Sequence, residues 1–564
     1  MRAIARRNLY TLFCNCKLNR SIPFLYYSDD SLSIFRKERF CFQPLPHCSR
    51  MRIINSIADF PLTRDGNFHG ATDVPVCPGC GVHMQDKDPK KPGFFSRPSE
   101  KWLSIHSKDY LVPISLDSHI SNSMKADFLQ PDESPPSKMP AEQNERPVVC
   151  ARCHSLRHYG KVKDLLAEKL LPEFDFFHTV GTRLTSAAGS RTVVLIVVDV
   201  SDFDGTFPSK VANLISDAIK QNATNWKEGK PGNVARLLVV ATKIDLLPTE
   251  ISPTQFEQWL RQRIRDGGAN SMKRLHFVSA VRNWGIKDLV DDVIELVGPR
   301  GNVWAVGTQN AGKSTLINAM ARCGDGKPSY LTEAPVPGTT LGIVRVEGVL
   351  PGNVKFFDTP GLLNSRQITS RLTMEEQKLV RMTKELKPRT YRIKKGHSIH
   401  IGGLMRLDTE QLSVDTIYVT VWVSPLVPLH MGKTENANTL MEEHFGRQLQ
   451  PPIGATRVQE LGKWVRHEIE VSCGSWDRSS VDIAGGGIGW FAVALKGEAT
   501  LGVWTYEGVE VVVRNSLIPH RSKTFEVAGF TASKVVSRAD QTSDKLRRRE
   551  KAKKMVNEQL FASD

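Results

Sequence analysis

The chain has 564 residues and a formal net charge of +16 at pH 7, with a pI near 9.3. At about 150 residues per domain, this length predicts three or four units, and the charge favours a polyanionic partner such as RNA or an anionic membrane surface. The longest apolar run, VVLIVV at 193–198, has the length of a strand and ends at Asp199, so we expect no membrane span.

The first segment, residues 1–55, is predicted to be a transit peptide or a disordered leader. It is basic and contains no acidic residue before Asp29, which is typical of organellar targeting peptides. A disordered basic tail is the alternative interpretation. The basic residues that carry the prediction are Arg2, Arg6, Arg7, Lys17 and Arg20.

Residues 70–165 contain two CxxC pairs, which in a chain that is not secreted favour metal binding over disulfides. They are Cys77, Cys80, Cys150 and Cys153. Four soft ligands with no open position predict a structural zinc site, with a redox dithiol pair or an iron-sulfur cluster as alternatives. The intervening residues 86–147 are rich in Pro, Ser, Lys and Asp and are predicted to form a disordered insertion.

From Arg191 onward, short β-branched runs alternate with amphipathic helical stretches. This alternation predicts an α/β domain over residues 185–365, with a mostly parallel sheet and helices on both faces. The apolar runs expected to form strands include TVVLIVVDV, RLLVVA, RLHFVSA and NVWAV.

The segment GTQNAGKST follows one of these strands and opens a helix, which is the context of a phosphate-binding loop. Lys313 is expected to reach the β and γ phosphates, and Ser314 to bind Mg²⁺. The predicted phosphate contacts are Gly307, Asn310, Ala311, Gly312, Lys313, Ser314 and Thr315.

The segment FFDTPGLL places Asp358 near the metal and Gly361 near the γ-phosphate. The preceding PVPGTTLG carries two threonines, of which we favour Thr340 as a Mg²⁺ ligand. The predicted catalytic residues are Lys313, Thr340, Asp358 and Gly361. Leu362 follows the glycine where many GTPases carry a water-positioning glutamine, so we expect slow intrinsic hydrolysis.

Two further segments are predicted to recognise guanine. In ATKIDLLP, the Asp245 carboxylate can accept both N1-H and N2-H of guanine, which adenine does not offer. Thr242 and Lys243 precede it, although asparagine is commoner at the position of Thr242. At the end of HFVSA, the backbone N-H groups of Ser279 and Ala280 suit the guanine O6.

The motifs stand in the order guanine motif, second base contact, phosphate loop, switch threonine and DxxG. The common arrangement begins with the phosphate loop, so this order is a circular permutation, which chains tolerate when their termini lie close together. Residues after Gly361 are therefore joined directly to the segment that senses the γ-phosphate.

Residues 366–535 are predicted to form a β-rich RNA-binding domain, and 536–564 a basic tail with a dense run at 545–554. The basic residues near the start of this domain either face RNA phosphates or form a solvated surface. They are Lys378, Arg381, Lys384, Lys387, Arg389 and Arg392.

The combined motifs, with CPGCGVHMQ, CARCHSLRHYG, LKPRTYRI, IGGLMRLD and GIGWFAV, resemble the YqeH-type circularly permuted GTPases. Within that family, the chain is similar to the plant organellar branch related to the brassinazole-insensitive pale green proteins. The long insertion and Thr242 depart from the pattern of the family.

The resemblance implies a monomeric ribosome-assembly GTPase that uses GTP or GDP with Mg²⁺ and a structural zinc ion, and acts on rRNA or a small ribosomal subunit. It favours a chloroplast location, with the mitochondrion as the alternative. Asn310 matches the asparagine that holds potassium in related GTPases, whereas a turn-capping role is the other interpretation.

Three functions remain open at this point. The first is an organellar ribosome-assembly GTPase, and the second is a GTP switch that acts on proteins without RNA. The third is an RNA-binding scaffold with a degenerate nucleotide site, which the intact Lys313, Ser314, Asp358 and Asp245 argue against.

Overall fold

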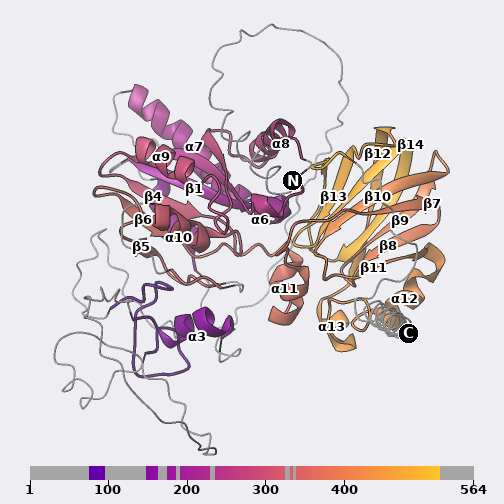
Figure 1. The fold of residues 1–564 in the computed structure, drawn as a ribbon, viewed down its shortest axis with the longest axis horizontal. Helices are drawn as coiled ribbons and strands as arrows, with labels where there is room; N and C mark the ends of the chain where they lie inside the picture. The colour runs from indigo at the N-terminus through magenta and orange to yellow at the C-terminus, as the bar shows by residue number, and fades with distance from the viewer. Residues whose placement is uncertain are drawn as a thin grey trace, which may run out of the picture.

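The computed structural model describes residues 75–95, 148–162, 174–185, 191–228, 235–249, 251–323, 331–334 and 338–520. The predicted leader, the predicted basic tail and most of the predicted insertion lie outside these residues. In the described part of the chain, no helix combines the length and apolarity that crossing a membrane requires. A small cysteine module lies beside an α/β domain, which in turn packs against a β-rich domain (Figure 1).

The α/β domain is a sheet in the order β3-β2-β1-β4-β6-β5. All neighbouring pairs are parallel except β5 and β6. Its strands are β1 Thr192–Asp199, β2 Arg236–Thr242, β3 Met272–Phe277, β4 Asn302–Val306, β5 Val344–Val346 and β6 Lys355–Asp358. Its longer helices are α7 Ser209–Lys227, α8 Pro253–Asp266, α9 Ile286–Val297 and α10 Lys313–Cys323, with the short α6 at Phe203–Thr206.

The central strand β1 is buried along its whole length, which explains its continuous β-branched sequence. Val194 and Ile196 face the core beneath α7 and α8. Val193 and Leu195 face the opposite core, beneath α9 and α10. The predicted mostly parallel sheet with helices on both faces is confirmed.

The α/β core also includes residues before the predicted start at 185. Three of these residues pack into the core, namely Phe176, Val180 and Leu184. Phe176 precedes the π-helical turn Phe177–Gly181, which contains Val180, and Leu184 lies on the short α5 (Thr182–Thr185). The domain therefore begins earlier than its strand pattern indicates.

The β-rich domain is an antiparallel sheet in the order β11-β8-β9-β14-β10-β7. The long β14 pairs with β10 and β13 through its first half and with β9 and β12 through its second. Its strands are β7 Arg389–Lys394, β8 His397–Ile401, β9 Met405–Leu412, β10 Thr416–Val423, β11 Leu429–Lys433, β12 Trp464–Ser475, β13 Val481–Gly485, β14 Gly489–Tyr506 and β15 Val511–Asn515. Its helices are α11 Met374–Val380, α12 Ala437–His444 and α13 Ala455–Glu460.

The two larger domains share one apolar interface. Trp422 and Trp490 of the β-rich sheet belong to the same buried cluster as the α7 and α8 side of the α/β core. Arg514 forms a buried ion pair with Asp204, and its guanidinium lies 5.0 Å from the ring centre of Trp259. Because apolar and ionic contacts both cross this boundary, the two domains form one packed unit.

The cysteine module is built around α3 (Ala151–Tyr159) and the segment that precedes the insertion. Gln85 pairs with Phe94 in an isolated bridge, and the Ala151 N-H donates to the Phe94 carbonyl at 2.7 Å. The folded module therefore continues to Phe95, inside the range predicted to be a disordered insertion, because these backbone groups are hydrogen-bonded to the second cysteine segment.

Candidate functional site

The loop between β4 and α10 curves around a cavity of about 330 Å³. Asn310 and Gly312 take the left-handed backbone conformations that this curvature needs, with φ of 61° and 91°. The loop and helix residues that line the cavity are Gln309, Asn310, Gly312, Lys313, Ser314 and Thr315.

Lys313 is buried at the base of this loop. Its Nζ donates to the carbonyls of Gly307 and Thr308 at 3.0 and 2.9 Å. Burial lowers the pKa of the ammonium to about 8, while the charge of Asp358 opposes that decrease. Among the described residues, no carboxylate pairs directly with Lys313, so the ammonium is available to a phosphate group.

Oxygen atoms of Ser314, Thr340 and Asp358 converge beside Lys313. Asp358 Oδ2 accepts hydrogen bonds from Ser314 Oγ at 3.0 Å and Thr340 Oγ1 at 2.9 Å. Asp358 Oδ1 is buried and has no hydrogen-bond partner among the described residues, and burial raises the pKa of this carboxyl group. This set fits Mg²⁺, a hard cation that prefers oxygen ligands and would neutralise charge on the phosphates.

Gly361 closes the phosphate side of the cavity. A Cβ atom at this position would lie 2.8 to 3.1 Å from atoms of Gln309, so the close approach of the two segments requires glycine. The next residue, Leu362, exchanges backbone hydrogen bonds with Gly307 and Gln309. Its side chain packs against the α/β core, which leaves no hydrogen-bonding side chain at this position to orient water.

Thr242 connects the predicted base-recognition segment to the phosphate loop. Its hydroxyl donates to the carbonyls of Val198 and Ala311 at 2.9 and 2.7 Å. Lys243 has a positive φ of 61°, and its Nζ donates to the Asn310 carbonyl at 2.9 Å. Threonine, at a position where asparagine is commoner, therefore links the base-recognition segment to the phosphate loop.

One of the N-H groups predicted to contact the base already has a partner within the protein. The Ser279 N-H already donates to the Trp284 carbonyl at 3.1 Å, and the Trp284 N-H returns a bond to Ser279 at 3.0 Å. That turn occupies the N-H group that was expected to contact guanine O6, and sequence spacing did not reveal it. Lys243 and Val281 line the cavity, whereas Asp245, Ser279 and Ala280 are not part of its lining.

The four predicted sulfur ligands meet in one buried cluster, with all Sγ atoms within 4.8 Å of one another. Cys77 and Cys153 lie 3.8 Å apart, as do Cys80 and Cys150. Thiolates bound tetrahedrally to one zinc ion at about 2.3 Å are separated by about 3.8 Å. The cluster is consistent with a structural zinc site and is tighter than the span of an iron-sulfur cluster.

Family comparisons agree with this geometry in three parts of the chain. Residues 302–396 match the model described as 50S ribosome-binding GTPase. Residues 417–517 match the model of the YqeH-like C-terminal domain. Residues 76–165 match the genetic interactor of prohibitins 3 N-terminal domain.

Individual relatives extend the similarity across these segments. The chain is 49% identical over 420 residues to the GTP-binding protein brassinazole insensitive pale green 2, chloroplastic, of Arabidopsis thaliana, covering 74% of this chain and 63% of the relative. It is 29% identical over 386 residues to the uncharacterized protein YqeH of Bacillus subtilis, covering 67% of this chain and 93% of the relative. The chain belongs to the YqeH-type circularly permuted GTPases.

In this YqeH-type GTPase, the cysteine module contacts the switch segment directly. The Cys80 carbonyl accepts hydrogen bonds from the N-H groups of Leu341 and Gly342 at 2.9 and 3.0 Å. Arg152 donates to the carbonyls of Gly338 and Thr339 at 2.6 and 3.3 Å. The cysteine module thus holds the backbone on both sides of Thr340 through the Cys80 carbonyl and the Arg152 side chain. The sequence did not predict this contact.

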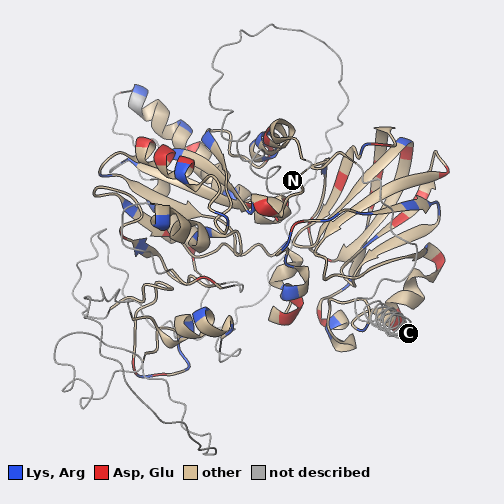
Figure 2. Ribbon diagram, in the orientation of Figure 1, with Lys and Arg blue, Asp and Glu red and all other residues tan. Residues whose placement is uncertain are grey.

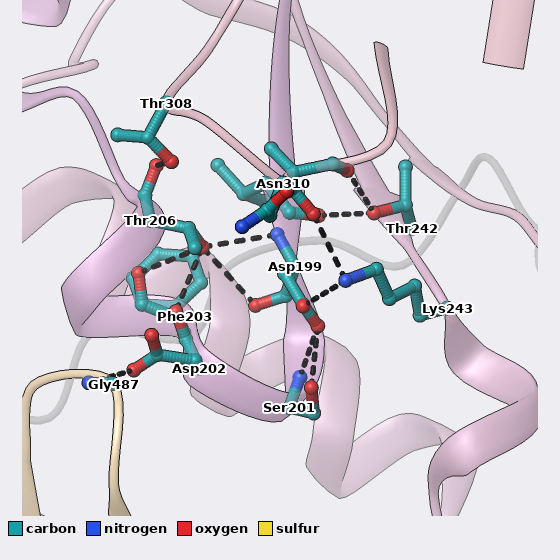
Figure 3. Close-up of polar contacts among 12 residues, drawn as sticks. Asp199, Ser201, Asp202, Phe203, Thr206, Thr242, Lys243, Thr308, Asn310 and Gly487 are labelled. Carbon is teal, nitrogen blue, oxygen red and sulfur yellow. Dashed lines mark hydrogen bonds and ion pairs between the residues drawn. The ribbon is translucent and has the colours of Figure 1, made fainter. Parts of the chain in front are cut away.

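Asp199 is a second residue that the sequence analysis did not assign to the site. It ends β1 and accepts hydrogen bonds from the Ser201 N-H at 2.9 Å and the Ser201 hydroxyl at 2.6 Å. It also forms an ion pair with Lys243, the residue that contacts Asn310 (Figure 3). Asp199 lies at the carboxyl end of β1, beside β4 and the phosphate loop that follows it. This position is the feature of the sequence that could have assigned it to the site.

Asp202 links this network to the β-rich domain of the YqeH-type GTPase. Its carboxylate accepts a hydrogen bond from Gln367 Nε2 at 2.6 Å. It accepts a second from the Gly487 N-H at 3.2 Å (Figure 3). Burial and the nearby charge of Asp199 raise its pKa to about 6. Because Gln367 follows the DxxG segment closely, movement of that segment would be transmitted to the β-rich sheet.

The basic stretch of the β-rich domain divides into two groups. Arg389 donates to the Val427 and Ser424 carbonyls, and Arg392 donates to Thr416 Oγ1. The Arg389 guanidinium is therefore used inside the domain, whereas Arg392 stays exposed despite its contact with Thr416. Four residues of the stretch are exposed, namely Lys378, Lys384, Lys387 and Arg392.

Proposed function

We propose that this chain binds GTP and hydrolyses it to GDP and phosphate, and that it acts as an assembly factor of an organellar ribosome. The observation that carries the nucleotide part is that Lys313, Ser314 and Thr340 line one cavity, while Asp358 accepts hydrogen bonds from the two hydroxyl groups. Lys313, Thr340, Asp358 and Gly361 supply the catalytic contacts, and Asp245 with the Ala280 N-H recognises guanine.

Hydrolysis by the isolated chain is slow in this proposal, because Leu362 cannot orient the attacking water. Asn310 is exposed at the tip of the phosphate loop, where its side-chain oxygen can hold a potassium ion close to the phosphates. Such an ion would stabilise the charge that develops during phosphoryl transfer.

Turnover is therefore expected to be about tenfold faster in potassium than in sodium at equal ionic strength. Asn310→Gly keeps the positive φ of 61° without strain, because glycine tolerates that conformation, so it removes the amide alone. The variant is expected to respond equally to both cations, as measured by phosphate release. Equal wild-type rates in the two salts would exclude the potassium role.

The ribosomal part of the proposal is supported by the name of the matching GTPase model and by the chain's net charge of +16. The name of the chloroplastic relative supports a chloroplast location, and a relative called chloroplastic/mitochondrial keeps the mitochondrion as the alternative. Figure 2 shows basic residues interspersed with acidic ones over the β-rich domain. We therefore assign RNA contact to discrete lysines such as Lys384 and Lys387, rather than to a continuous basic face.

Sedimentation of organelle extract tests the partner. The tagged chain is expected to migrate with a ribosomal subunit in the presence of a nonhydrolysable GTP analogue, and to shift toward lighter fractions with GDP. The Lys313→Ala variant serves as the control and is expected to show no difference between nucleotides. Absence from ribosomal fractions in every nucleotide state would favour a GTP switch that acts on proteins.

A further inference from the structure

Arg381 occupies a point where the two domains meet. The preceding Val380 packs into the core of the β-rich domain, and the following Met382 packs into the α/β core. A few residues later, the Leu386 N-H donates to the Leu246 carbonyl at 2.8 Å, directly beside the base-recognition segment. The backbone of Arg381 is therefore fixed from both sides.

The side chain of Arg381 borders the nucleotide cavity and has no ionic partner there. It lines the same cavity as Lys313, Thr340 and Gly361. Among the described residues, its guanidinium makes no hydrogen bond or ion pair. Burial lowers its pKa, while the charge of Asp199, which lines the adjoining cavity, opposes that decrease. The guanidinium is therefore partly desolvated without a direct partner, which favours contact with an anion.

The neighbours of Arg381 identify the end of the cavity that it faces. An adjoining cavity is also lined by Arg381, and the two share Lys243 as well as Gln309 and Asn310 of the phosphate loop. The adjoining cavity further includes Leu363 and Asn364, immediately after the DxxG segment. Arg381 therefore lies near the junction of the phosphate loop, Lys243 and the DxxG segment.

We propose that Arg381 is a catalytic residue for GTP hydrolysis, a cationic contact to the γ-phosphate that the β-rich domain supplies within the same chain. This inference rests on the proposed GTPase function. In the step, water attacks the γ-phosphorus, the bond to the bridging oxygen breaks, and GDP leaves with that oxygen, while the proton lost by the water goes to the released phosphate. Arg381 donates N-H groups to the oxygens that gain charge and transfers no proton, as arginine fingers do.

This assignment gives the packed domain interface a catalytic consequence. Arg381 reaches the cavity because the connection between α11 and β7 packs against the α/β domain. Displacement of the β-rich domain would therefore withdraw its side chain from the cavity. It also differs from the sequence-based interpretation, in which Arg381 belonged to a stretch that either faces RNA phosphates or forms a solvated surface. Lys384 and Lys387, in the same connection, are exposed and remain available for that role.

Single-turnover hydrolysis and nucleotide affinity test the proposal with Arg381→Ala, Arg381→Lys and the control Arg322→Ala, which removes an exposed cation from α10 outside the cavity. Removal of the guanidinium is expected to slow hydrolysis of bound GTP by about 10²-fold, as loss of one preorganised transition-state contact does. The affinity for GDP with aluminium fluoride, which mimics the transferring phosphoryl group, is expected to fall by a similar factor, while GDP affinity stays near that of the wild type. Arg381→Lys keeps the charge but not the planar fork, so partial recovery is expected.

The outcomes separate this inference from the function on which it rests. Wild-type rates in Arg381→Ala would overturn the catalytic role while leaving the GTPase function intact. Equal losses of GDP and GTP affinity, with unchanged hydrolysis of the bound nucleotide, would also overturn it, because they indicate contact with the base or the β-phosphate. A wild-type chain that binds GTP without hydrolysing it would overturn both.

Discussion

Replacement of Lys313 by alanine is expected to weaken GTP binding by about 10²- to 10³-fold, or roughly 3–4 kcal/mol, as truncation of one partner in a buried charge contact does. The ammonium is buried and donates to two carbonyls of the loop that surrounds it. In the complex, it would exchange those neutral acceptors for phosphate oxygens. The alanine variant has no ammonium group to bind the phosphate oxygens, so their negative charge is less well neutralised.

The control for this prediction is Arg322→Ala. Arg322 lies on the same helix, α10, and is exposed near its end. Its replacement removes an equal charge from a residue that does not line the cavity. Fluorescence titration with a labelled GTP analogue measures both affinities, and the thermal unfolding midpoint shows whether each variant is folded. Unchanged affinity in a folded Lys313→Ala protein would favour the scaffold with a degenerate nucleotide site.

The α/β domain could be predicted from sequence because its information is local. The phosphate loop is one continuous segment between β4 and α10, and the strands that carry the motifs are buried on both faces, so their β-branched runs are distinct. The parallel arrangement then places the carboxyl ends of β1, β2 and β4 at one edge. These features require no knowledge of contacts between distant segments.

The unpredicted parts of the site depend on such distant contacts. Arg381 resembles the other basic residues of its stretch, and its role depends on how Val380 and Met382 pack into different cores. The occupied N-H of Ser279 depends on a turn that returns through Trp284. The contact between Arg152 and Gly338 joins segments that are 186 residues apart, and spacing within a motif carries no information about it.

Removal of the metal from the cysteine module is expected to weaken nucleotide binding at the neighbouring site. The module holds the backbone on both sides of Thr340 through Cys80 and Arg152. A structural zinc ion contributes folding free energy directly, so its loss would unfold the module. Restoring order to the freed residues would then oppose GTP binding by about 1–2 kcal/mol for each one.

Cys150→Ser is therefore expected to lower zinc content and to weaken GTP binding by at least about tenfold, since ordering even one or two residues costs that much. GDP binding is expected to change less, because the Thr340 contact belongs to the GTP state. Cys323→Ser removes an exposed thiol on α10 that lies outside the cluster and is the matched control. Arg152→Ala separates metal loss from switch contact, because it keeps all four sulfurs and removes the two hydrogen bonds to Gly338 and Thr339. If Cys150→Ser loses zinc and becomes protease-sensitive in the module while GTP affinity is unchanged, the contacts around Thr340 do not couple the two sites.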